Sequence, residues 1–327
     1  MIKYLVIRFS SIGDIVLTTP VIRCLKNQVA DSEIHYLTKE KYNSVLVNNP
    51  YIDRLWLFED DLHSIIGELQ KESFDYIIDL HNNLRSNIVR RKLGILSFPF
   101  NKINVQKWLM VNFKLNRLPK LHIVDRYMET LRLFDVKNDG QGLDYFLSEE
   151  DMDLPREVRS NLPDSFVTLV IGAQHSTKKL PARKLAAICD RIDVPVLILG
   201  DSADSEVAEQ INRYSSNSLI QDLCGALSLN QSAYLVKQSI AVITHDTGLM
   251  HIAAAFKKKI ISIWGNTIPE FGMYPYIANQ DSLQFEVKNL RCRPCSKIGF
   301  DKCPKKHFRC MNDQDENAIA EAVNRIL

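Results

Sequence analysis

Apolar runs alternate with segments of helical spacing along most of the chain. Short runs rich in β-branched and aromatic residues predict buried strands; these are residues 2–9, 33–37, 53–58, 74–81, 166–171, 194–199, 240–243 and 260–265. Apolar positions recurring every three or four residues predict helices; these are residues 15–29, 42–48, 62–71, 123–134, 182–192, 203–214, 229–238, 249–256 and 314–327. This alternation predicts an α/β fold with doubly wound parallel sheets.

An acidic, proline-containing stretch at residues 149–163 separates two series of such elements. We place the domain boundary there, near residue 155, which gives lobes of residues 1–155 and 156–327. Two successive series predict two Rossmann-like lobes facing a cleft, with ligands beyond the carboxyl ends of the strands. No G-x-G-x-x-G follows the strands of the first lobe, so the dinucleotide fingerprint is absent there. The final helix is a candidate to pack back onto the first lobe.

Composition narrows the class of protein. The chain has 327 residues, of which 46% are hydrophobic and 24% charged, so two cores of ordinary globular type are expected. The net charge is +2 and no stacking or finger module is present, so nucleic-acid binding is not indicated. No apolar stretch reaches the ~18 residues that cross a bilayer, and the amino terminus lacks a signal-peptide pattern. We expect a cytoplasmic protein whose contact with any membrane is peripheral.

The first candidate site is the polar turn after the first strand, Ser10-Ser11-Ile12-Gly13-Asp14. A carboxylate at this edge of a sheet is suited to accept a proton from a sugar hydroxyl. The alternative is that Asp14 is the N-cap of a helix beginning at Ile15. From these residues alone the capping role is favoured.

The second candidate is the loop from Gly172 to Pro181, which follows the first strand of the second lobe. Lys178 precedes a helix that begins with proline, where a cation could neutralise a diphosphate leaving group. The alternative is an ordinary surface lysine, and the adjacent Lys179 competes for the same role.

The third candidate is a strand, turn and helix around Asp246-Thr247-Gly248-Leu249. Asp246 and Thr247 are N-cap residue types, and backbone amides at a helix start suit a phosphate. An ordinary strand-to-helix turn is the alternative. His251 lies one turn into this helix, either facing the cleft or anchoring the helix as a hydrogen-bonded structural histidine.

Together these three stretches resemble the heptosyltransferases of glycosyltransferase family 9, whose patterns read S-x-x-G-D, K-x-[WL]-P and D-[ST]-G-x-x-H-x-A-A-A. The resemblance implies a GT-B fold. It implies that Asp14 is the catalytic base and Lys178 the phosphate ligand, although Leu180 stands where tryptophan is commoner. The remaining residues that it implicates in substrate binding are Ser10, Ser11, Gly13, Asp222 (at a ribose-contacting position), Asp246, Thr247, Gly248, Leu249 and His251.

The activity that the resemblance implies is inverting transfer of a heptose or related sugar from a nucleoside diphosphate sugar. The expected donor is ADP-heptose. The implied acceptor is an anionic glycolipid of the lipopolysaccharide inner core. No cofactor and no catalytic metal are implied, because a lysine and a helix terminus supply the positive charge. The rival interpretations are a nucleotide-sugar epimerase or hydrolase on the same fold, and a non-catalytic nucleotide-sugar-binding protein.

Four of the seven cysteines cluster near the carboxyl end, as Cys292-x2-Cys295-x7-Cys303-x6-Cys310. The first pair has chelating spacing, but the later spacings form no second knuckle. A structural zinc ion, an iron–sulfur cluster, and unliganded thiols or occasional disulfides all stay open.

Residues 85–120 differ from the rest of the first lobe, because basic residues there are interleaved with aromatic and aliphatic ones. Solvated faces of ordinary elements are one interpretation. The other is an insertion that meets an anionic, partly apolar acceptor at a membrane surface.

Overall fold

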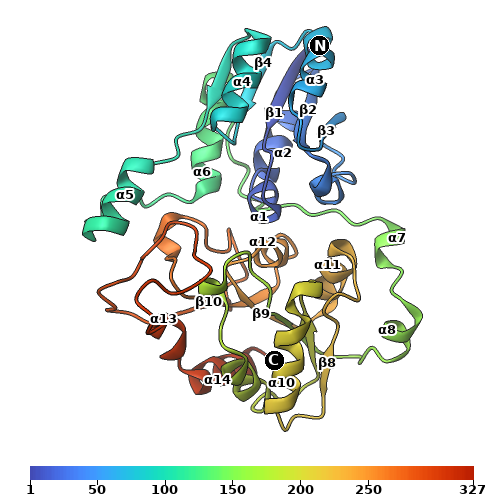
Figure 1. The fold of residues 1–327 in the computed structure, drawn as a ribbon. Coiled ribbons are helices and arrows are strands. Elements are labelled where there is room, and N and C mark those ends of the chain that lie inside the picture. Colours follow the sequence, from blue (N-terminus) through green and yellow to red (C-terminus); the bar gives the residue numbers. More distant parts are fainter. The chain divides into compact units, whose positions relative to one another are not determined.

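A computed structural model describes all residues, 1–327 (Figure 1). The chain divides into two compact units. The first contains Met1–Ile103 and Leu121–Phe146, and the second contains Asn104–Lys120 and Leu147–Leu327. The segment 104–120 therefore belongs with the second unit, although it interrupts the sequence of the first. None of the helices combines the length and the apolar composition that a membrane span requires.

The first unit is built on a five-stranded parallel sheet in the order β3-β2-β1-β4-β5. Its strands are β1 (Ile2–Ile7), β2 (Ser32–Lys39), β3 (Arg54–Phe58), β4 (Tyr76–Asp79) and β5 (Ser97–Pro99). Central β1 is apolar and fully buried toward its end, as expected of a strand covered on both faces. Its carboxyl end carries the Ser10–Asp14 turn.

The helices of the first unit are α1 (Ile12–Val16), α2 (Thr19–Gln28), the 3₁₀ helix η1 (Glu40–Val45), α3 (His63–Lys71), α4 (Leu84–Leu93), α6 (Ile123–Met128) and the 3₁₀ helix η2 (Glu129–Phe134). The single helix expected over residues 15–29 is wrong, because the structure has α1 and α2 there. Pro20 has no N–H to continue α1, and the Thr18 and Thr19 hydroxyls donate to the carbonyls of Ile15 and Val16.

The second unit contains a six-stranded parallel sheet in the order β11-β10-β9-β6-β7-β8. Its strands are β6 (Val167–Val170), β7 (Val196–Leu199), β8 (Ile220–Asp222), β9 (Ala241–His245), β10 (Lys259–Trp264) and β11 (Leu283–Glu286). The two edge strands, β8 and β11, are absent from the sequence prediction. Their side chains are exposed or half-buried, so they carry no buried apolar run.

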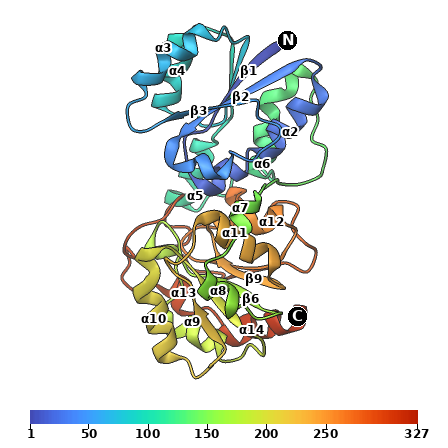
Figure 2. The same ribbon diagram turned by 90° about the vertical axis from the view of Figure 1, so that its right-hand side faces the viewer.

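The helices of the second unit are α5 (Asn104–Phe113), α7 (Glu149–Met152), α8 (Arg156–Ser160), η3 (Ser176–Lys178), α9 (Ala182–Cys189), η4 (Ser202–Asp204), α10 (Ser205–Tyr214), α11 (Leu229–Gln238), α12 (Gly248–Ala255), η5 (Pro269–Phe271), α13 (Arg309–Asn312) and α14 (Glu316–Ile326). Figure 2 shows α9 and α14 on one side of the sheet and α11 and α12 on the other. The apolar face of α14 packs within the second unit, and packing of this helix onto the first lobe stays a prediction. Ile319 and Val323 are buried in the core of the second unit, where α14 contacts α9.

Candidate functional site

Asp14 lies in the first turn of α1, directly after β1. Its Oδ1 is 2.9 Å from the Arg8 guanidinium, and its Oδ2 accepts the hydroxyl of Ser11 at 3.0 Å. The Ser11 amide also donates to Oδ2, at 3.3 Å. Ser11, and not Asp14, is the N-cap residue, since α1 begins at Ile12. The side chain of Asp14 is still 21% exposed, so a substrate hydroxyl could reach a carboxylate whose position is fixed.

Arg8 is the residue that positions Asp14, and the sequence prediction gave it no such role. It is buried, and it donates to the Ser10 carbonyl at 2.7 Å and the Leu80 carbonyl at 2.6 Å. A further bond, 3.1 Å long, reaches the Tyr127 hydroxyl. Burial acts to lower the pKa of Arg8, but the charge of Asp14, the nearby hydroxyls of Tyr127 and Tyr36 and the hydrogen bond to Asp14 together raise it, and the net shift is upward. Arg8 is therefore a fixed positive charge behind the carboxylate.

His81 lies beside this turn, at the carboxyl end of the strand run predicted over residues 74–81. Its ring is 4.9 Å from that of Phe9, and burial together with the charge of Arg8 lowers its pKa to about 3. The imidazole is therefore neutral at physiological pH and is not a second cation at this edge. Its position after β4 is the signal by which the sequence could have identified it.

In the second unit the structure brings Lys178 and Asp246 together. Lys178 ends η3, and its Nζ lies 2.5 Å from Oδ2 of Asp246, which follows β9. Thr267, after β10, donates to the same oxygen at 3.2 Å. Two of the predicted motifs, separated by 68 positions in sequence, thus form one polar cluster.

Lys179 has a different partner. Its Nζ is 2.6 Å from Oδ1 of the buried Asp204. A Cβ on Gly172 would come within 2.7 Å of Oδ2 of Asp204, and one on Gly200 within 2.9 Å, so both glycines make room for this carboxylate. Lys179 is therefore engaged in holding the strand ends together, which leaves Lys178 as the lysine beside α12.

The start of α12 is capped by Thr247, whose hydroxyl oxygen accepts the amide of Met250 at 3.3 Å. Gly248 and Leu249 are the first two helical residues, and the leading amides of a helix point away from its own carbonyls. Together with the helix dipole, such amides favour an anion. His251 is only 2% exposed, which favours its structural interpretation.

His245 is a site residue that the sequence prediction missed. Its Nε2 accepts the amide of Leu180 at 2.9 Å, which ties the Lys178 loop to the end of β9. Burial, reinforced by the charge of Lys179, lowers the pKa of His245 to about 4, so the ring is a neutral acceptor. The one available signal was its position, directly before Asp246.

Asp222 ends the edge strand β8 and is exposed. Its Oδ1 accepts the amide of Cys224 at 2.9 Å, so the carboxylate caps a turn. The contact with a ribose stays a prediction.

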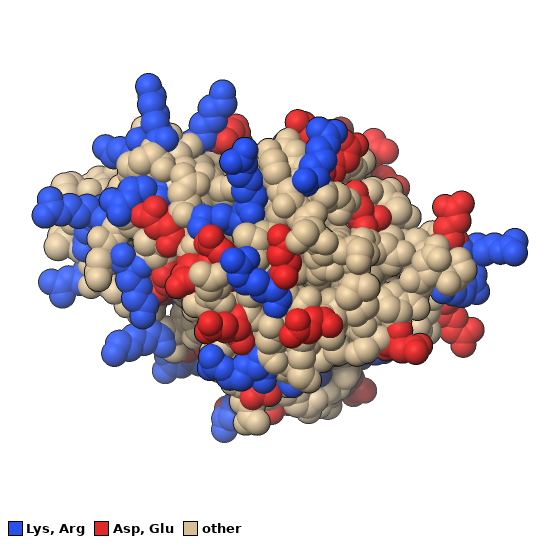
Figure 3. Space-filling view, turned by 90° about the horizontal axis from the view of Figure 1, so that it is seen from below, with Lys and Arg blue, Asp and Glu red and all other residues tan.

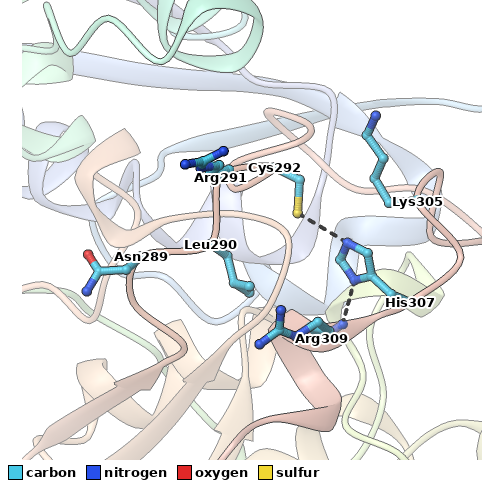
Figure 4. Close-up of a pocket in the computed structure, with 7 residues that line it drawn as sticks. All are labelled: Asn289, Leu290, Arg291, Cys292, Lys305, His307 and Arg309. Atoms are coloured by element: carbon cyan, nitrogen blue, oxygen red, sulfur yellow. Dashed lines mark hydrogen bonds between the residues drawn. The ribbon is translucent and has the colours of Figure 1, made fainter.

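The four carboxyl-terminal cysteines are free thiols, and no group of three or more His, Cys, Asp or Glu side chains could hold a metal ion. Figure 4 shows Cys292 directed toward His307, whose Nε2 lies 3.7 Å from the sulfur. Both residues line a pocket of about 460 Å³, with Asn289, Leu290, Arg291, Lys305 and Arg309. Burial raises the pKa of Cys310 to about 12, which favours its neutral thiol. Metal binding by the four cysteines stays a prediction.

Comparison of the chain with known proteins shows the family to which it belongs. The family described as "Glycosyltransferase family 9 (heptosyltransferase)" matches residues 62–301, well over half of the chain. The chain belongs to glycosyltransferase family 9. It is therefore a glycosyltransferase, as the resemblance predicted. The matched range contains Lys178 and Asp246 and begins after Asp14.

The relatives within the family are heptosyltransferases. Lipopolysaccharide heptosyltransferase 1 of Campylobacter coli is 26% identical over 288 residues, covering 81% of this chain and 84% of the relative. The solved structure of ADP-heptose lps heptosyltransferase II from E. coli is 18% identical, with a TM-score of 0.75 and coverage of 99% and 98%. The E. coli heptosyltransferase WaaC with ADP is 16% identical, with a TM-score of 0.68 over 100% of both chains. These structural neighbours confirm the predicted GT-B fold.

Proposed function

We propose that this glycosyltransferase moves a heptose from ADP-heptose to an inner-core acceptor of lipopolysaccharide, with inversion at the anomeric carbon. The names of its relatives support the sugar and the acceptor class, because they are lipopolysaccharide heptosyltransferases. The E. coli structural neighbour with bound ADP supports the nucleotide.

Asp14 is the proposed general base. It takes the proton of the acceptor hydroxyl, whose oxygen then forms a bond to the anomeric carbon on the face opposite the diphosphate. Arg8 and Ser11 hold the carboxylate in one orientation, at 2.9 and 3.0 Å, so that little reorganisation is needed. Ser10 and Gly13 complete the turn around it.

Lys178 and the amides of Thr247, Gly248 and Leu249 are proposed to bind the diphosphate. As the glycosidic bond to the donor breaks, negative charge grows on the departing ADP. A lysine and a helix terminus at that point stabilise this charge. In this account Asp246 holds Lys178 in place, and Asp222 contacts the ribose.

The acceptor is proposed to be an anionic glycolipid, met by the enzyme at the cytoplasmic face of the inner membrane. The contact with the membrane is peripheral in this proposal. No cofactor is needed for the steps described.

The pairing of Lys178 with Asp246 at the start of α12 is the observation that carries the proposal, because it places a cation beside a helix terminus. Calorimetric titration with ADP, UDP and GDP tests it on wild type, Lys178→Ala and, as a control, Lys184→Ala. Lys184 is likewise paired at 2.5 Å, but with Glu316 of α14.

We expect preference for ADP, at least about tenfold weaker binding in Lys178→Ala, and unchanged binding in Lys184→Ala. Preference for UDP or GDP would overturn the assigned donor. Binding of none of the three nucleotides would overturn the transferase site. Hydrolysis or epimerisation of the donor without acceptor would instead favour the rival enzyme classes.

A further inference from the structure

Helix α5 and the residues after it expose an unusual amount of apolar surface. No residue of α5 is buried. Val105 is 67% exposed, Trp108 55% and Phe113 59%, and the rings of Trp108 and Phe113 contact each other at 5.2 Å. Leu115 continues this surface, at 54% exposed. Exposed apolar clusters of this kind mark interaction sites.

The charge of the same segment is of one sign. From residue 80 to residue 124 the chain has nine Lys or Arg and no Asp or Glu. Four of these cations lie in the part grouped with the second unit: Lys107, Lys114, Arg117 and Lys120. The apolar side chains are therefore surrounded by positive charge that no acidic residue of the segment offsets.

A second loop of the same unit, residues 288–309, extends this surface. Lys114 Nζ donates to the carbonyl of Pro294 at 2.7 Å, which joins the two segments. The loop carries eight Lys or Arg against one acid, Asp301, and it exposes Ile298 (57%) and Phe300 (39%). In Figure 3 Lys and Arg crowd the left edge, the side on which Figure 1 places α5 and the loops before α13.

We propose that residues 104–120 and 288–309 together form a docking surface for an anionic bilayer. Trp108, Phe113 and Ile298 enter the interface between headgroups and acyl chains, while Arg117, Lys120 and their neighbours contact lipid phosphates. An aromatic and aliphatic cluster bordered by cations fits an anionic lipid surface in both polarity and charge.

The docking surface is linked to the Lys178 loop. The Thr177 amide and hydroxyl donate to the Phe300 carbonyl at 3.1 and 2.9 Å, and the hydroxyl oxygen accepts the Phe300 amide at 2.8 Å. The loop that touches the bilayer is thus bonded to the residue preceding Lys178. This inference rests on the proposed function in one respect: the acceptor that the membrane-bound enzyme would meet is linked to a lipid.

Flotation of the full chain with vesicles tests the proposal. The vesicles are phosphatidylcholine alone or with about a third phosphatidylglycerol. The variants are Trp108→Ala/Phe113→Ala and Arg117→Gln/Lys120→Gln. The matched controls are Leu133→Ala/Leu219→Ala, which removes exposed leucines elsewhere, and Lys41→Gln/Lys71→Gln, which removes exposed lysines of the first unit.

We expect wild type to bind anionic vesicles at least about tenfold better than neutral ones, with loss of binding at high salt. Each α5-region variant should bind anionic vesicles about tenfold less, and both controls as wild type. Equal binding of the α5-region variants and wild type, or equal binding to neutral vesicles, would overturn the proposal.

Transfer to a water-soluble acceptor fragment separates this inference from the proposed function. The α5-region variants should keep that activity within about twofold, since they touch neither Asp14 nor Lys178. Wild type that binds vesicles but transfers nothing would defeat the proposed function alone. Wild type that transfers but does not bind vesicles would defeat the docking surface alone. Thermal unfolding of each variant checks that it folds.

Discussion

The two units contain similar turns, but the more exposed member of the ion pair differs between them. In each, a buried parallel strand leads to a carboxylate that is paired with a cation and lies at the start of a short helix. In the first unit the carboxylate is the more exposed partner, with Asp14 at 21% and Arg8 at 9%. In the second it is the cation, with Lys178 at 16% and Asp246 at 12%. In the proposed function, the same pair of charges presents a proton acceptor in one unit and a phosphate ligand in the other.

The difference comes from which partner the surrounding structure holds. Arg8 is fixed by two carbonyls and a tyrosine hydroxyl behind the turn, so Asp14 projects beyond it. Asp246 is fixed by Thr267, so Lys178 is the partner that projects. Residue type alone does not assign these roles, because an aspartate occurs in both turns.

The sharpest test of this comparison is Asp14→Asn. The amide keeps the size of the side chain but cannot take a proton, so kcat/KM for transfer should fall about 10³-fold. ADP binding, which we assign to the second unit, should stay within about twofold. Steady-state kinetics and calorimetry measure the two. Transfer within about tenfold of wild type would show that Asp14 is not the base.

A buried histidine of the second unit, His245, and a half-buried one of the first, His81, are both neutral, and they provide the second test. The pKa of His245 is lowered to about 4, so the folded state resists a proton that the unfolded state binds near pH 6.5. The free energy of unfolding should therefore decrease as pH falls from about 6.5 to about 4, by about 3 kcal/mol for this residue.

Urea unfolding of wild type and His245→Asn across that pH range measures this contribution, and the variant should lose most of it. His81→Asn is the matched variant in the first unit, where the pKa is lowered to about 3. It should remove a separate part of the same pH dependence. If neither substitution changed the pH profile, the two histidines would not be neutral as described.

Lys178→Ala should lower both transfer and ADP affinity, in contrast to Asp14→Asn. We expect about a 10²-fold fall in kcat/KM, because one cation at the leaving group is lost. Lys178→Arg should restore part of it, since the charge returns with a different shape. A variant that bound ADP normally would place the phosphate ligand at another residue.

The smallest effects are expected from removing the two hydroxyl groups that bond to the carboxylates. Ser11→Ala removes the 3.0 Å bond to Asp14, and Thr267→Val removes the 3.2 Å bond to Asp246. Each bond contributes about 1 kcal/mol, or about fivefold. Ser11→Ala should lower kcat with ADP affinity unchanged, and Thr267→Val should weaken ADP binding. The reverse pattern would exchange the roles of the two units.

Local pattern was enough for much of the fold. Buried strands such as β1 and β9 were predicted because both of their faces are apolar, and the three turns were predicted at their carboxyl ends. The edge strands β8 and β11 were not predicted, because their exposed and half-buried residues carry no such apolar pattern. The break between α1 and α2 was also missed, although Pro20 marks it.

The sequence by itself determined the alternation of strands and helices, the three polar turns and the basic, aromatic stretch around α5, because each depends on neighbouring positions. Only the tertiary structure decided the partners. β6 pairs with β9, with Val170 opposite Thr244, and this register places Lys178 beside Asp246. Arg8 behind Asp14, His245 against the Leu180 amide and α5 in the second unit follow likewise from packing. Periodicity records whether a residue is buried, whereas the order of strands in a sheet decides which distant residue it meets.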